Sequence, residues 1–294
     1  MVVNGENQSH DFIQLVSVRF AELTKSEKRI ATYLRKNLDD CAFLSAAEVA
    51  DRLAVSEATV VRFARNMGFG SYPALREELQ NNFRKRITHS SRLRSKLDDL
   101  RQAGDIFERL TVSEIDYLTQ ALETVDRQQL HRAVELLTER ERIYVFGLGP
   151  SITLVDLLEL RLKRSGKVVI TLTESGREVL ENLLIMGPDD LLFMIGFFDV
   201  NPTLTLVMDY AREVGCKTII LTDTLGSIIG DKADVVLAAD RGPVSKFHSL
   251  VVPMTIINTL LLSVASQEPE KIMPTLDKMD MLRGRLKNFQ RKDV

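Results

Sequence analysis

Cysteine is scarce in this sequence: Cys41 and Cys216 are the two examples among 294 residues. They lie far apart and lack the spacing of metal ligands, which argues against a disulfide framework and a zinc module and favours a reducing compartment. The first residues, MVVNGENQSH, have neither a basic start nor an apolar run, so we expect no signal peptide. These absences predict a cytoplasmic protein without a metal site.

Long hydrophobic runs are also missing. The most apolar stretch, residues 250–265, is shorter than the roughly 20 residues that cross a membrane, and it contains Pro253, Asn258 and Ser263. We interpret it as a buried helix and expect no membrane partner.

Charge of one sign is not in large excess, since the net charge is −2, but it is unevenly distributed. Residues 1–96 hold 16 Lys and Arg against 11 Asp and Glu, a balance of +5, and residues 97–294 hold 23 against 30, a balance of −7. A basic first part on an acidic remainder is expected when the first part alone meets a polyanion, although a solvated surface has the same pattern.

The length exceeds that of most single domains, which predicts two. We place a first domain at 1–85, a linker with connecting helices at 86–128, a second domain at 129–268 and a helical tail at 269–294.

Three helix starts are marked in the first domain. Thr24 with Glu27 and Ser45 with Glu48 fit the capping box, so helices are expected to begin near 25 and 46. Ser56 opens a third helix, and the turn before it is very short. Two short helices around a tight turn indicate a helix-turn-helix.

The third helix shows what this motif does. A buried stripe is predicted at Val60, Phe63, Ala64 and Met67. The opposite face is polar, as in a recognition helix that enters the major groove. We expect base contacts from Ser56, Glu57, Thr59 and Arg62, and a phosphate contact from Arg65. Further phosphate contacts are candidates at Lys25, Ser26, Lys28 and Arg29.

The segments ELTKSEKRIATYL and SAAEVADRLAVSEATVVRFARNMGFGSY resemble the N-terminal domain of the RpiR (MurR) family of bacterial transcriptional regulators, from about Phe12 to Phe83. The resemblance implies a helical domain that binds a double-stranded DNA operator as part of a dimer or larger homo-oligomer.

The pattern changes after residue 142. RIYVFGLG, KVVITLT, DLLFMIGF, KTIILTD and DVVLAAD are short apolar runs separated by helix-like stretches, which predicts a parallel sheet covered on both faces. The expected fold is therefore an all-α helix-turn-helix domain followed by a three-layer α/β domain with a five-stranded parallel sheet. Ligand loops of such a sheet follow the carboxyl ends of its strands.

The first loop, GLGPSI, invites a dinucleotide interpretation. Gly147 and Gly149 fit two glycines of the fingerprint, and Glu174 follows the second strand, where a ribose-binding acid would lie. The third glycine is Ile152, however, and Pro150 removes an amide that would face a pyrophosphate. We expect no nicotinamide and no other cofactor.

FGLGPS and ILTDTLGSIIGDKADVVL resemble the sugar isomerase (SIS) domain, over about 130–265. The resemblance implies recognition of a phosphorylated sugar or related metabolite that modulates DNA binding, with Ser151 and Ser227 matching family serines. The strand-end loops supply the full set of ligand-binding candidates: Gly149, Ser151, Glu174, Asp199, Thr203, Thr222 and Ser227.

The third loop departs from the family's S-x-S-G phosphate cradle, because the same positions hold Gly196, Phe197, Phe198 and Asp199. A carboxylate near a phosphate dianion is unfavourable unless a cation lies between them. We therefore predict an effector whose phosphate is absent or held differently.

Each candidate in these loops also has a structural interpretation. Phe197 or Phe198 is expected to pack at the sheet end, Ser151 to cap a helix, and Asn201 with Pro202 to start the next helix. Lys246 and His248, before the last long helix, are candidates for a cation or a base, or simply part of an exposed helix start.

Three functions stay open. The first is a non-enzymatic transcription regulator of carbohydrate or related metabolism whose operator binding responds to a sugar-derived metabolite. The second is a phosphosugar isomerase, for which the loops show no paired acid and base. The third is a DNA-binding protein whose SIS domain is a dimerisation scaffold alone.

Overall fold

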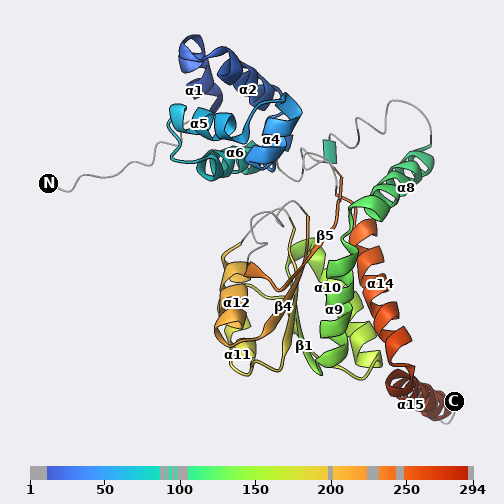
Figure 1. Cartoon of the computed structure of the whole chain (residues 1–294). Helices are drawn as coiled ribbons and strands as arrows, with labels where there is room; N and C mark the ends of the chain where they lie inside the picture. The colour runs from blue at the N-terminus through green and yellow to red at the C-terminus, as the bar shows by residue number, and fades with distance from the viewer. Residues whose placement is uncertain are drawn as a thin grey trace. The chain divides into compact units, whose positions relative to one another are not determined.

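The computed structural model describes residues 12–86, 90, 93, 94, 97, 105–197, 201–223, 232–242 and 248–290. The chain divides into two compact units, Met1–Arg109 with Gly242–His248, and Leu110–Arg241 with Ser249–Val294 (Figure 1). Three predicted site residues, Asp199, Ser227 and Lys246, lie outside the described residues, as does Phe198.

The first unit is all-helical, as predicted. Its helices are α1 (Phe12–Arg19), α2 (Lys25–Lys36), α3 (Leu38–Cys41), α4 (Ala46–Leu53), α5 (Glu57–Asn66) and α6 (Tyr72–Arg86), with a 3-10 turn at Phe20–Glu22. Both predicted capping boxes are present, at Thr24 with Glu27 and at Ser45 with Glu48. They satisfy backbone amides at the first turn of α2 and of α4, which fixes where the two helices begin.

The turn between α4 and α5 is tight and contains no glycine. Ala54 adopts a left-handed conformation with φ 48°, and the Val55 amide donates to the Ala50 carbonyl at 3.0 Å. This closes α4 and lets α5 start three residues later. Ile30 and Leu34 of α2, Val49 of α4 and Phe63 of α5 are fully buried, so all three helices direct apolar side chains into the interior of the first unit.

The second unit contains a five-stranded, all-parallel sheet in the order β2-β1-β3-β4-β5. The strands are β1 (Arg142–Gly147), β2 (Val168–Leu172), β3 (Leu191–Ile195), β4 (Lys217–Thr222) and β5 (Val235–Ala238). All five match predicted runs. The helices are α8 (Ile106–Thr124), α9 (Arg127–Glu139), α10 (Ile152–Arg164), α11 (Leu180–Leu183), α12 (Pro202–Glu213), α14 (Val251–Gln267) and α15 (Pro269–Gln290).

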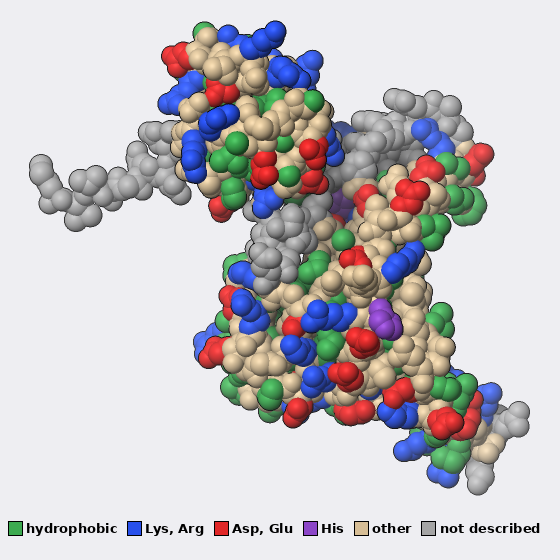
Figure 2. Space-filling view, viewed as in Figure 1, with side chains coloured by type: hydrophobic (Ala, Val, Ile, Leu, Met, Phe, Trp, Pro, Cys, Tyr) green, Lys and Arg blue, Asp and Glu red, His purple; other side chains and the backbone are tan. Residues whose placement is uncertain are grey.

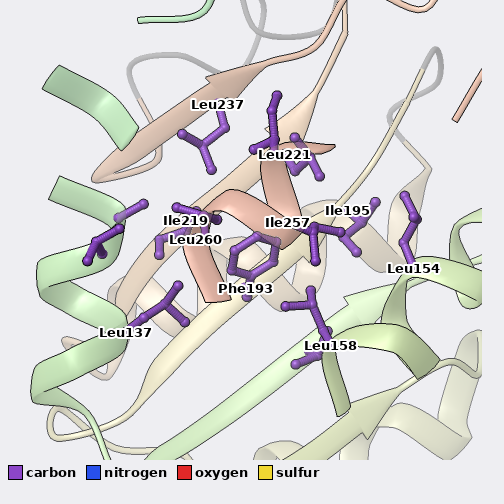
Figure 3. Close-up of a cluster of buried hydrophobic side chains, with 14 of the residues drawn as sticks. Leu137, Leu154, Leu158, Phe193, Ile195, Ile219, Leu221, Leu237, Ile257 and Leu260 are labelled. Atoms are coloured by element: carbon purple, nitrogen blue, oxygen red, sulfur yellow. The ribbon is translucent and has the colours of Figure 1, made fainter. Parts of the chain in front are cut away.

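Two helical layers cover the sheet, which confirms the three-layer prediction. Helices α9, α10 and α14 pack on one face and α11 and α12 on the other (Figure 1). Phe193 and Ile195 of β3 contribute to the first core with Leu158 of α10 and Ile257 of α14 (Figure 3). A sheet buried on both faces leaves its carboxyl edge as the place where loops meet a ligand.

The apolar segment 250–265 forms most of α14, whose Ile257 and Leu260 are fully buried in this core. Among the described residues, no single helix is long and apolar enough to cross a membrane; α14 and α15 meet the criterion only as a pair bent by 104°.

Candidate functional site

Helix α5 presents a continuous polar ridge. The Ser56 hydroxyl accepts from the Thr59 amide at 3.3 Å and shares a hydrogen bond of 2.7 Å with the Thr59 hydroxyl. The Thr59 hydroxyl in turn accepts from Nη2 of Arg62 at 3.3 Å. Ser56, Glu57, Arg62 and Arg65 are exposed and Thr59 is half-buried. The ridge thus carries donors and acceptors at the N-terminal half of a helix whose other face is core.

The residues of the ridge differ in how many of their hydrogen-bonding groups are already used within the protein. Ser56 and Thr59 are engaged in capping α5, whereas Arg62 uses one of its five N–H donors internally. The guanidinium is therefore pre-positioned along the ridge with donors left for a base edge or a phosphate.

A polar cluster that the sequence pattern did not predict holds the C-terminal end of α5. The buried Glu27 carboxylate of α2 accepts from the Thr24 amide at 2.9 Å, the Thr24 hydroxyl at 2.7 Å and the Asn66 side chain at 2.5 Å. Arg19 donates to the Asn66 carbonyl at 2.9 Å. Asn66, predicted to face solvent, is exposed yet ties α5 to α2. Glutamate at the third position of a capping box was its only signal in the sequence.

Burial opposes ionisation of Glu27, but the hydrogen bonds from Thr24 and Asn66 and the nearby positive charge of Arg62 prevail and lower its pKa below 4.5. A lowered folded-state pKa stabilises the first unit above about pH 4.5, and this stability is lost as the pH falls through the folded-state value. We expect the melting temperature of the first unit to fall as the pH is lowered from 6 to 3. Glu27→Gln is expected to make this fall smaller. Glu57→Gln, which removes an exposed carboxylate of α5, is the control; an equal reduction by both variants would contradict the assignment.

A basic groove lies on α2. It has a volume of about 690 Å³ and is lined by Lys25, Lys28, Arg29, Thr32, Tyr33, Lys36, Asn37 and Leu53. Arg29 donates to the Leu53 carbonyl at 2.6 Å, next to the turn that precedes α5. Figure 2 shows Lys and Arg side chains spread over the exposed surface of the first unit. Three of the four predicted phosphate contacts, Lys25, Lys28 and Arg29, thus line one groove.

In the second unit, the strand order reverses between β1 and β3, which are neighbours in the sheet but are not consecutive along the chain. Such a reversal opens a crevice outside the carboxyl ends of the strands. Gly149 and Ser151 form a 3-10 turn after β1, Thr203 lies in the first turn of α12, and Thr222 ends β4. Glu174 follows β2 and is exposed.

Two of these residues, Ser151 and Thr222, have buried side chains. Ser151 is buried, and its side chain makes no capping hydrogen bond, so the interpretation of Ser151 as a helix cap was wrong. Ser151 has a helical backbone, with φ −66° and ψ −19°, whereas a capping residue usually has an extended one. The Thr222 hydroxyl is fully buried and has no partner among the described residues. Asn201 caps α12 by accepting from the Leu204 amide at 2.8 Å, with Pro202 at the first position, as predicted.

The start of the third loop cannot hold the family's first serine without rearrangement. A Cβ added at Gly196 would lie 2.5 Å from Cδ1 of Leu204, which is buried against β3. A side chain at this position therefore requires the end of the Leu204 side chain to shift. Phe197 packs against the core beside α14, which confirms the structural interpretation for this ring.

A buried arginine that was not among the predicted site residues also lies at this edge. Arg241, three residues beyond β5, is 8% exposed, and its guanidinium lies 4.0 Å from the centre of the Phe197 ring. Its Nη1 forms an ion pair with Asp223 at 3.6 Å. An arginine in a segment that looks like an ordinary strand exit gives no sign of burial. His248, a predicted candidate nearby in sequence, is half-buried. No group of three or more metal-ligating side chains occurs in the described part of the chain.

Comparison with protein families matches residues 11–86 to the helix-turn-helix domain of the rpiR family and residues 136–263 to the SIS domain. The transcriptional regulator HexR of Pseudomonas aeruginosa is 26% identical over 273 residues, covering 90% of this chain and 93% of HexR. HexR of Escherichia coli is 25% identical over 233 residues, covering 78% of each chain.

Two solved structures extend the likeness. The sugar isomerase domain of an RpiR transcription factor from Sphaerobacter thermophilus is 26% identical with a TM-score of 0.57, covering 60% of this chain and 99% of that one. The NanR protein of Vibrio vulnificus, complexed with ManNAc-6P, is 24% identical with a TM-score of 0.65, covering 94% and 99%. Fold and site thus define a helix-turn-helix DNA-binding domain followed by a SIS domain. The chain combines a helix-turn-helix domain of the rpiR family with a SIS domain, and it is similar to HTH-type transcriptional regulators over most of its length.

Proposed function

We propose that the chain binds operator DNA through α5 and that a sugar-derived metabolite at the carboxyl edge of the SIS sheet changes this binding, without catalytic turnover. The observation that carries the proposal is the ridge on α5, where Ser56, Thr59 and Arg62 form one hydrogen-bonded row on an exposed face. The relatives named as transcriptional regulators support the same role.

Arg62 is assigned to a base edge and Arg65 to a phosphate. Arg62→Ala is then expected to reduce discrimination between operator and random DNA by about 1–3 kcal/mol. Arg65→Ala is expected to weaken binding to both DNAs equally and to lower the salt slope by about one unit. Fluorescence anisotropy at several salt concentrations, with DNA selected from a random pool by the full chain, measures both effects. Equal losses on both DNAs for Arg62→Ala would reassign it to a phosphate.

A dimer is proposed through α8 and α14. The sequence of α14 has no charged residue, and its exposed positions include Met254 (41% exposed) and Leu262 (71%). An apolar groove of about 270 Å³ runs between α8, α9 and α14. Hydrophobic side chains are also exposed along α8, including Leu122 at 70% (Figure 2). An uncharged helical face beside an apolar groove has the composition of an interface core, and a two-fold axis would pair it with itself.

The effector is proposed to be a sugar derivative whose phosphate is absent or is not held by the loop after β3. The support is the close approach of Gly196 to Leu204 and the ring of Phe197, which replace the family's cradle. An effector sugar and its phosphorylated form are therefore expected to raise the melting temperature of the chain to a similar degree. Thermal-shift titrations with glucose 6-phosphate, fructose 6-phosphate and ManNAc-6P, each against its phosphate-free sugar, check this.

The outcomes of that titration separate the remaining functions. Stabilisation that requires the phosphate would contradict the altered cradle. A silent panel would favour the SIS domain as a dimerisation scaffold, a role that the packed start of the third loop also suits. Conversion of any compound in the panel into an isomer, followed by NMR, would favour the isomerase.

A further inference from the structure

Arg241 lies at the junction of the strand-end loops and the helices that follow. Phe197 and Asp223 lie two positions beyond Ile195 of β3 and Leu221 of β4, which are paired in the sheet. Alternation along a strand directs residues two apart to the same side, here the side covered by α9, α10 and α14. Figure 3 shows Ile195 and Leu221 among the side chains of this core, with Ile195 near Ile257 of α14.

Arg241 contacts both loops and the entry of α14. Its guanidinium stacks on Phe197 at 4.0 Å and pairs with Asp223 at 3.6 Å. Its Nε donates to the Ser249 carbonyl at 3.1 Å, and the Ser249 amide donates back to the Arg241 carbonyl at 3.3 Å. One buried side chain thus contacts the loop after β3, the loop after β4 and the residue that precedes α14.

Ser249 carries the connection onward to α8. Its hydroxyl donates to the Glu114 carboxylate of α8 and accepts from the Val251 amide at 3.0 Å. No side chain of α8 is fully buried, and its contacts with the core come from Tyr117, Leu118 and Ala121, which are partly buried. Glu114 precedes them, toward the end of α8 that leads back along the chain to the DNA-binding domain. This hydrogen bond therefore holds α8 at a residue that precedes its apolar contacts with the core.

The ion pair between Arg241 and Asp223 makes the position of Arg241 depend on the loop after β4. Arg241 and Asp223 are both about nine-tenths buried, with side chains 9% and 10% exposed. Moving the Asp223 carboxylate away weakens an ion pair of a buried guanidinium, which is unfavourable. Arg241 is then expected to move with it, and the Ser249 carbonyl and the Glu114 bond are disturbed in turn.

We propose that Arg241 is a positioning residue that couples the loops after β3 and β4 to helix α8 through Ser249 and Glu114. The proposal rests on the proposed function in one respect: it supplies the step between effector loops and the helix that continues to the DNA-binding domain. A ligand that binds more tightly when Phe197 or Asp223 is displaced would shift the equilibrium position of α8.

Hydrogen–deuterium exchange of the full chain, without DNA or effector, tests the coupling. Asp223→Asn and Glu114→Gln are each expected to speed exchange of amides 110–118 by about threefold or more, while α10 is unchanged. The double variant is expected to exchange no faster than the faster single variant, because both act on one chain of contacts. Additive effects, or no effect of Asp223→Asn on α8, would overturn the proposal.

Matched controls keep the result specific. Asp189→Asn and Glu123→Gln remove exposed carboxylates from the second unit and from α8, and neither is expected to alter exchange at 110–118. If Asp223→Asn also speeds exchange in α10, Phe197→Leu is used in its place. Phe197→Leu keeps an apolar side chain but removes the ring under Arg241. It is likewise expected to speed exchange at 110–118 and to leave α10 unchanged. If the unmodified chain does not bind operator DNA, the proposed function is contradicted. The exchange experiment still tests the coupling, because it uses neither DNA nor effector.

Discussion

Leu262→Glu is expected to convert the proposed dimer into a monomer and to lower operator affinity by about 100-fold or more. Leu262 is 71% exposed on an uncharged face of α14, so glutamate is tolerated in the monomer. In a two-fold interface, the same change places two carboxylates close together without a counter-charge. The monomer then binds with one recognition helix and loses the affinity that a dimer gains from binding with two.

Sedimentation and DNA binding of the full chain measure these two effects. Leu184→Glu is the matched control, because Leu184 is 77% exposed beside α11, on the opposite side of the sheet, and is expected to change neither quantity. A Leu262→Glu protein that remains dimeric would place the interface elsewhere, and a monomer that binds operator at full affinity would contradict the dimeric mode of recognition.

Phe63→Ala is expected to unfold the DNA-binding domain at physiological temperature while the SIS domain stays folded. Phe63 is fully buried beneath the ridge of α5. Truncating such a ring costs about 3–5 kcal/mol. In a domain of this size that lowers the melting temperature by more than about 12 °C and consumes much of the total stability. Operator binding disappears because α5 is then no longer held on α2 and α4.

Calorimetry separates the two domains, with the SIS transition as an internal reference. Val18→Ala, at a site 79% exposed on α1, is the control and is expected to leave both transitions in place. A loss below about 1 kcal/mol would show that the cavity collapses and that α5 does not depend on this ring. Equal shifts of both transitions would show that the two domains unfold together.

The sequence by itself determined the elements whose signals are local. The side chains of Thr24, Ser45 and Asn201 satisfy amides within one turn, so the starts of α2, α4 and α12 could be predicted from short motifs. The five apolar runs became the five strands because a sheet buried on both faces demands continuous hydrophobic residues. The polar ridge of α5 likewise follows from helical periodicity.

Tertiary structure alone decided the features made by residues far apart in the chain. The bond from Asn66 to Glu27 spans 39 positions, and the close approach of Gly196 to Leu204 depends on how α12 packs on β3. Arg241 meets Phe197 and Asp223 because three parallel strands end side by side, and a buried charge becomes tolerable only where such partners converge. Local patterns report what one segment prefers, whereas convergence at a sheet edge depends on strand order and packing.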